Sequence, residues 1–105
     1  MKIALRDIAA VIRSKNSGPY ELTFDVMLKD RATYEKIREA NVINTDVIAE
    51  LYRIPAKDVL SIVWFPNALA VKATIVRPLP SGDIGERDVY GAEQHAPLMN
   101  FEFEL

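Results

Sequence analysis

The amino-acid sequence predicts an α+β sandwich, in which two helices cover one face of a mixed or antiparallel sheet of three to four strands. Apolar and polar side chains alternate over residues 20–28, which is the pattern of a half-buried strand. Two stretches with helical periodicity follow, at about 31–40 and 45–52. The apolar stretches 59–65 and 69–76 then flank a Pro-Asn turn pair, which indicates an antiparallel hairpin.

The two helices have recognisable ends. Asp30 is a good N-cap, because its carboxylate can accept hydrogen bonds from backbone N–H groups two or three residues later. This first helix is expected to run to about Ala40. Asn44 or Thr45 caps the second helix, which ends before Pro55. Both helices are polar on their remaining faces, so we expect them to cover one side of the sheet.

A short helix and a polar loop are expected before the first strand. Apolar residues recur at i, i+3, i+4 and i+7 over 5–12, which favours one face of a helix; a short strand through Ile3 and Leu5 is the alternative. Residues 13–19, Arg-Ser-Lys-Asn-Ser-Gly-Pro, are typical of a loop, because Ser and Asn compete for backbone hydrogen bonds and proline disfavours helix before it. This loop leads into the strand at 20–28.

The order of elements suggests a topology. If the strands at 20–28 and 59–65 are parallel, they are joined by a right-handed crossover, and the strand at 69–76 lies between them or outside the pair. The first placement is the split βαβ arrangement of ferredoxin-like domains, which is the fold we predict. The chain is expected to be one domain with an extended C-terminal segment at 79–105. Its end, 101–105, alternates like a strand that pairs with this sheet or with a neighbouring chain's sheet.

Composition limits the classes of function. The 105 residues include no cysteine, which rules out a disulfide, a thiolate nucleophile or a zinc site built on cysteine. The net charge of −2 argues against nucleic acid or an anionic membrane as the main partner. No apolar run is long enough to span a membrane, and the N-terminus is acidic too early for a signal peptide. We therefore expect a cytoplasmic protein without a cofactor or a metal.

Two stretches resemble a small uncharacterised bacterial family of unknown function. They are Leu-Arg-Asp-Ile-Ala-Ala-Val-Ile-Arg-Ser-Lys-Asn-Ser-Gly-Pro at 5–19 and Asp-Val-Tyr-Gly-Ala-Glu-Gln-His-Ala-Pro-Leu at 88–98. Members of that family stand beside, or are fused to, AtuA-like proteins of acyclic terpene utilisation. The loop Arg-Ser-Lys-Asn-Ser-Gly at 13–18 and the hairpin turn Pro-Asn-Ala-Leu at 66–69 give a second resemblance, to the ferredoxin-like C-terminal domain of AtuA-like proteins. The resemblance implies a role beside a larger AtuA-like partner, in organic-acid or acyl-thioester catabolism.

The polar stretch at 13–18 is the first candidate site. Arg13 can hold a carboxylate or phosphoryl group bidentately, and Lys15 supplies a point charge. Ser14, Asn16 and the flexible backbone at Gly18 add further hydrogen-bonding groups. The alternative is a solvated turn whose side chains bond their own backbone.

His95 is the only histidine, and it lies close in sequence to Tyr90 and Gln94. A histidine can act as a general acid or base near neutral pH. The alternative is a structural histidine that bonds a backbone carbonyl and holds its loop. With Lys15, His95 forms the candidate catalytic pair, and Tyr90 and Gln94 join the candidate ligand-binding set.

Two other pairs of residues have ordinary interpretations. Glu21 and Asp25 lie on one face of the strand at 20–28; two such carboxylates can serve acid–base chemistry but more often form the wet face of a sheet. Trp64 and Phe65 are interpreted as core or interface anchors.

Three functions remain open from the sequence. The first is a small subunit that works with an AtuA-like partner and binds an organic acid or its thioester, with both polar motifs at one site. The second is a stand-alone lyase or hydratase, with His95 as acid–base and Lys15 or Arg13 holding the substrate carboxylate. The third is a binding or regulatory module without chemistry. Exposed strand edges and the tail at 101–105 also predict a homo-oligomer, with a dimer favoured.

Overall fold

A computed structural model of the chain describes residues 2–18, 20–76 and 96–104. Within these residues the chain is α+β, with four α-helices and two antiparallel sheets, one of four strands and one of two. None of the described helices is long and apolar enough to cross a membrane.

The larger sheet has the strand order β2-β3-β5-β4. Its strands are β2 (Ala9–Gly18), β3 (Glu21–Leu28), β5 (Ala70–Val76) and β4 (Val59–Phe65). Every neighbouring pair is antiparallel, so β3 and β4 run parallel with β5 between them. This is the first of the two placements left open by the sequence. The assignment of the whole chain to the ferredoxin-like class stays a prediction.

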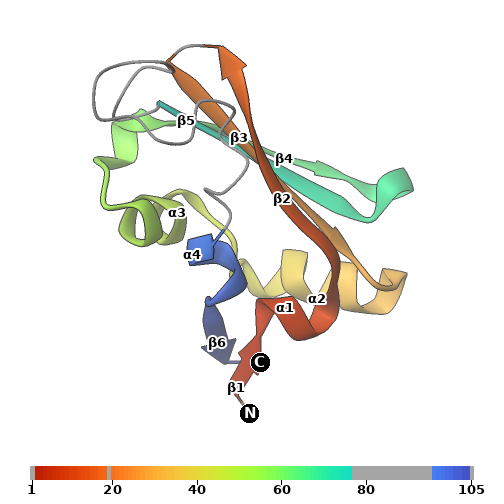
Figure 1. Cartoon of the computed structure of the whole chain (residues 1–105). Coiled ribbons are helices and arrows are strands. Elements are labelled where there is room, and N and C mark those ends of the chain that lie inside the picture. The colour runs from red at the N-terminus through yellow and green to blue at the C-terminus, as the bar shows by residue number, and fades with distance from the viewer. Residues whose placement is uncertain (1, 19, 77–95, 105) are drawn as a thin grey trace.

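The helices lie on one side of this sheet (Figure 1). Helix α2 (Arg31–Ala40) begins at Asp30, whose carboxylate accepts from the Thr33 backbone N–H at 2.7 Å. That hydrogen bond lowers the pKa of Asp30 below its usual value. Helix α3 (Thr45–Tyr52) begins at Asn44, whose side chain accepts from a backbone N–H in the first turn. Both predicted helices and the cap at Asp30 are therefore confirmed, and the second cap is Asn44.

The stretch before β3 differs from the prediction. Helix α1 has only four residues (Leu5–Ile8), and the chain then enters the ten-residue strand β2. The expected loop at 13–18 is thus wrong, because these residues form the second half of that strand. Its backbone groups pair with β3 along the register from Ala9–Leu28 to Gly18–Glu21. Pairing with β3 supplies hydrogen bonds that offset the weak strand propensity of Ser and Asn.

The two ends of the described chain meet in the smaller sheet. Strand β1 (Lys2–Ala4) pairs antiparallel with β6 (Glu102–Glu104), below the larger sheet in Figure 1. The predicted C-terminal strand therefore exists and pairs with its own chain. Helix α4 (Ala96–Met99) precedes β6, and the Leu5 backbone N–H donates to the Phe101 carbonyl at 2.9 Å.

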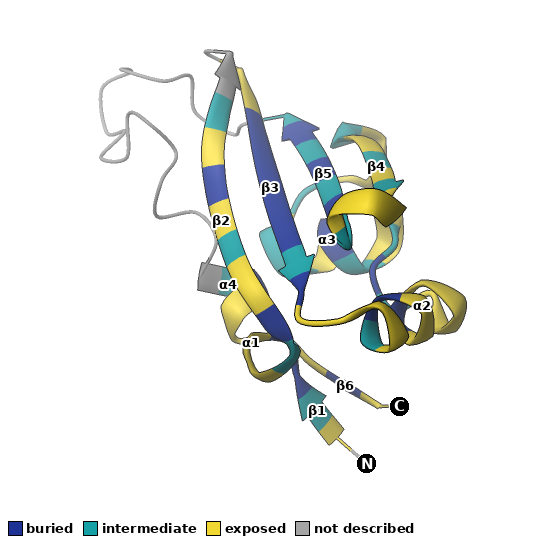
Figure 2. Ribbon diagram, turned by 90° about the vertical axis from the view of Figure 1, so that its right-hand side faces the viewer, coloured by how far each residue is buried: buried dark blue, intermediate teal, exposed yellow. Residues whose placement is uncertain are grey.

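The core lies between the larger sheet and the helices. In Figure 2, β3 is buried over most of its length, whereas β2 alternates between buried and exposed residues. Two short 3-10 helices, at Ala56–Asp58 and Pro66–Ala68, precede and follow β4. The largest fully buried side chains are contributed by β3, β5 and the helices α1 to α4: Tyr34, Phe24, Leu5, Leu22, Ile37, Ile48, Ile75, Leu98 and Val71.

Tyr52 is expected to make the stability of the fold depend on pH in the alkaline range. Its ring stacks on Phe24 with centroids 4.3 Å apart, and burial raises the pKa of its hydroxyl, while a hydrogen bond with the Leu98 backbone opposes that shift. The unfolded chain loses the Tyr52 proton from pH about 10, but the folded chain retains it. The free energy of unfolding should therefore fall above this pH, by up to about 1.4 kcal/mol per pH unit from this group.

Urea unfolding at pH about 8 and about 11 tests this expectation. The fall in stability between the two pH values should be smaller in Tyr52→Phe than in the native chain. Tyr20→Phe is the matched control, because Tyr20 is 61% exposed. Equal losses in the two variants would show that Tyr52 is not the responsible group.

Candidate functional site

The face of the larger sheet that points away from the helices carries three rows of side chains. On β3, the residues Leu22, Phe24 and Val26 are in the core, so Thr23 and Asp25 point to the other side, as side chains alternate along a strand. The strand register then defines what lies beside them. We call this surface the open face. It comprises an apolar row (Val11, Met27, Ala70, Phe65), a charged row (Arg13, Asp25, Lys72, Val63) and a hydroxyl row (Lys15, Thr23, Thr74, Ser61).

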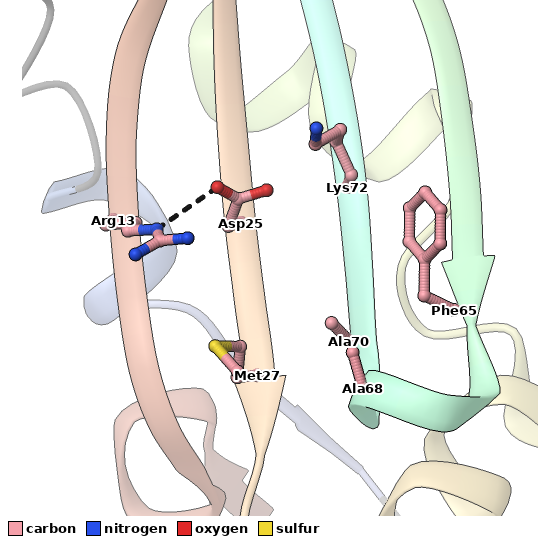
Figure 3. A pocket seen from close by; sticks show the side chains of 7 residues that line it. All are labelled: Arg13, Asp25, Met27, Phe65, Ala68, Ala70 and Lys72. Atoms are coloured by element: carbon pink, nitrogen blue, oxygen red, sulfur yellow. Dashed lines mark hydrogen bonds and ion pairs between the residues drawn. The ribbon is translucent and has the colours of Figure 1, made fainter.

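The charged row places one carboxylate between two cations. Arg13 Nε donates to Asp25 Oδ2 at 3.2 Å, and Lys72 lies directly opposite Asp25 on the next strand (Figure 3). The Arg13 side chain is 62% exposed, but that of Asp25 is only 12% exposed. Within the part of the chain that the structure describes, no ion pair engages Lys72. One positive charge of this row is therefore not matched by Asp25.

The neighbouring hydroxyl row adds a third cation. Lys15 is exposed at the β2 end of this row. The hydroxyl groups of Thr23 and Thr74 lie 3.4 Å apart, close enough to share a hydrogen bond. Together the two rows hold three cationic side chains and one carboxylate, although the whole chain carries a net charge of −2. The two rows are thus locally positive on a mildly acidic protein, although Glu21 precedes Thr23 on the same face of β3, and a locally positive surface attracts anions.

A shallow hollow lies where the charged row meets the apolar row. Its volume is about 250 Å³. Figure 3 shows the cationic groups toward one end of this region and Met27 and the two alanines toward the other. Such a mixed lining suits a molecule with an anionic head and a small apolar body. The lining consists of Arg13, Asp25, Met27, Phe65, Ala68, Ala70 and Lys72.

The structure divides the first predicted site between two faces. Arg13 and Lys15 lie on the open face, where they pair with Asp25 and Thr23. Ser14 and Asn16 pair with Phe24 and Leu22, whose side chains are in the core, so they point to the helix-covered side. A loop could have turned all four side chains toward one ligand. A strand alternates them, and only Arg13 and Lys15 share a surface.

The other predicted site residues are Gly18, Tyr90, Gln94 and His95, and the structure describes only the first of them. Gly18 is the last residue of β2 and pairs with Glu21. Tyr90, Gln94 and His95 lie outside the described residues, so their proximity to Lys15 stays a prediction. Over 2–18, 20–76 and 96–104, no cluster of three or more His, Asp or Glu side chains is arranged to hold a metal ion.

Several residues of the open face were missed from the sequence. Lys72 was visible only as a polar position on an alternating strand, since its register against Asp25 depends on the β3–β5 pairing. The sequence offers Asp25 for acid–base chemistry or, more often, for the wet face of a sheet, whereas in the structure it is buried and paired with Arg13. Trp64 packs edge-on against Tyr34, with ring centroids 5.6 Å apart, which agrees with a core anchor.

Over the described residues, fold and surface together define a small α+β domain whose sheet has one helix-covered face and one open, locally positive face. A family model described as a domain of unknown function, DUF4387, matches residues 5–102 of the chain. The chain therefore belongs to the DUF4387 family. Comparison with curated proteins gave no match, and comparison with solved structures gave none either.

Proposed function

We propose that this chain is a small subunit or accessory domain that works with a larger AtuA-like protein in organic-acid or acyl-thioester catabolism. Its open face binds the acid group. The observation that carries the proposal is the meeting of Arg13, Lys15 and Lys72 on one face, beside a hollow with an apolar lining. The identity of the partner is inferred from the motifs at 5–19 and 88–98, which resemble the family that accompanies AtuA-like proteins.

Charge and polarity favour an organic acid over other anions. A polyanion such as nucleic acid needs an extended positive surface, but this chain has a net negative charge. One carboxylate or one phosphoryl group matches the local excess of positive charge on the open face. The apolar row beside these cations adds contacts for the carbon chain of an organic acid, which inorganic phosphate cannot use.

The shape of the hollow favours a partner. Binding sites for small molecules bury about 70–90% of the ligand surface. Among the described residues, this shallow hollow lies on one face of a sheet and covers a ligand from below only. A larger protein seated on the open face would bury the rest of the ligand surface and strengthen the binding that is expected of the chain alone. Exposed apolar side chains at the edge strands, Val11 on β2 and Val63 and Phe65 on β4, extend the surface available to that partner.

Co-purification with the AtuA-like protein of the same organism tests this proposal. The two chains should co-elute from a sizing column. Phe65→Asp should weaken the complex by more than about tenfold, because it places a charge in the covered surface. Leu60→Asp is the matched control: Leu60 is 49% exposed against 42% for Phe65, and it lies on the same strand outside the three rows.

The result that would overturn the proposal is separate elution together with an unchanged activity of the partner on mixing. Light scattering on the same column reports whether this chain alone is a dimer, which we also propose. A stand-alone lyase or hydratase instead requires turnover by the purified chain that is lost in His95→Ala. A non-catalytic module requires thermal stabilisation by an acid without any turnover.

A further inference from the structure

We propose that the hollow on the open face selects free monocarboxylic acids with a short apolar chain, of about six carbons in all. The carboxylate lies against Lys72, on the side away from Asp25, and the chain lies along Met27, Ala70 and Phe65. This inference rests on the proposed function and narrows it, since that proposal leaves the kind of acid open.

The distance between the two rows sets the length of the ligand, and the hollow of about 250 Å³ is large enough for a six-carbon acid. The charged row and the apolar row are two residues apart along each strand, which is about 6.6 Å. An extended chain of five carbons beyond the carboxyl carbon covers this separation.

Polarity sets the orientation of the ligand. Lys72 is partly buried between Asp25 and Val63, and no ion pair engages it among the described residues. Partial burial of an unpaired ammonium is unfavourable, so a second carboxylate that pairs with Lys72 would be stabilised there. In the apolar row, Met27 and Ala70 line the bottom of the hollow, and Phe65 on the edge strand β4 borders it. A neutral chain fits this row, whereas a second charge would lose water there without finding a partner.

Asp25 explains why the ligand has one carboxylate only. It holds Arg13 Nε at 3.2 Å and is itself largely shielded from solvent. The charged row therefore has room for one more negative charge. A dicarboxylate would have to place its second group against the apolar row or beside Asp25, and both are unfavourable. A thioester lacks the acid's charge at its carbonyl and would leave Lys72 unpaired.

NMR titration of the isotope-labelled chain with defined acids tests the inference. Hexanoate should shift the amide signals of Asp25, Met27, Ala70 and Lys72. Across acetate, butyrate and hexanoate, the affinity should rise about twofold for each methylene, as expected for a half-buried chain. Adipate, the dicarboxylate of equal length, and hexanol should each bind at least about tenfold more weakly than hexanoate.

Two variants and one control locate the site. Lys72→Gln should weaken hexanoate about tenfold, which is the loss expected for one charge-assisted contact. Phe65→Ser should reduce the difference between hexanoate and acetate without changing the affinity for acetate. Lys36→Gln removes the same charge from an exposed position of α2, on the helix-covered side, and should change neither affinity.

Three other outcomes of these experiments would each overturn a particular part of the proposal. Equal affinities for acetate and hexanoate, both reduced by Lys72→Gln, would overturn the chain selectivity and leave the proposed function intact. Hexanol binding as tightly as hexanoate would overturn the role of the cations. Signals of the open face that respond to no acid at all would overturn both this inference and the proposed acid site. The chain-length series uses the native protein, so its result does not depend on how well a variant folds.

Discussion

Replacing Phe24 with alanine is expected to lower the free energy of unfolding by about 3–5 kcal/mol. Phe24 lies in the middle of β3, where its side chain is 1% exposed. It stacks on Tyr52 of α3, with a ring separation of 4.3 Å and an angle of 27° between the planes. Alanine would remove this contact and leave a cavity between the sheet and the helix. The expected loss is a large part of the total of about 5–15 kcal/mol for a small domain.

Urea unfolding followed by circular dichroism measures this loss. Tyr20→Ala is the control, because Tyr20 is an aromatic residue just before the same strand but is 61% exposed; its effect should stay within about 0.5 kcal/mol. Phe24→Leu, which keeps most of the buried volume, provides a measurable value if the alanine variant does not fold. Similar losses for Phe24→Ala and Tyr20→Ala would contradict the packing described here.

Replacing Leu98 with alanine should lower the free energy of unfolding by about 2–5 kcal/mol. Leu98 is 1% exposed and belongs to the same core cluster as Leu5 and Phe24. Helix α4, which carries it, has only four residues and is too short to be stable alone. Its position therefore depends on the burial of Leu98 and on the backbone hydrogen bond from Phe101 N–H to the Leu98 carbonyl at 3.1 Å.

Met99→Ala is the control for this second prediction, since Met99 is the next residue in α4 and is 38% exposed. Its effect should be below about 1 kcal/mol. Equal effects of the two substitutions, measured by thermal and urea unfolding, would mean that α4 is not part of the core. A large loss of stability in Leu98→Ala but not in Met99→Ala would show that residues 96–104 stabilise the domain and do not simply extend from it.

The helices and the hairpin were predictable because their signals are local. An Asp or Asn N-cap and a buried stripe of period 3.6 lie within a dozen residues of each other, so α2 and α3 follow from short-range chemistry. The same holds for β4 and β5, whose apolar runs flank the turn at Pro66–Ala68. No distant contact is needed to recognise any of these elements.

Strand β2 could not be predicted in this way. Its residues Arg13 to Gly18 have loop-like composition, and they become a strand because β3 offers a complete row of backbone partners. Irregularities in the register, between Ala9 and Val11 and between Asn16 and Gly18, also decide which side chains face outward. Bulges of this kind depend on the pairing of two strands and leave no clear local pattern.

The candidate site was predicted in part. The sequence alone established a cysteine-free, mildly acidic α+β chain with capped helices, an alternating strand and cationic groups at Arg13 and Lys15. Composition and short-range periodicity are sufficient for these statements, because each depends on a few neighbouring residues.

Tertiary structure decided which of those groups act together. Strand pairing brings Lys72 beside Asp25, whose other side is occupied by Arg13, although Lys72 is far from both in the sequence. Alternation sends Ser14 and Asn16 to the other face. The hollow beside Met27 and Phe65 exists only when β2, β3, β5 and β4 lie in register. Register is set by long-range packing of the core against α2 and α3, which no local pattern of residues specifies.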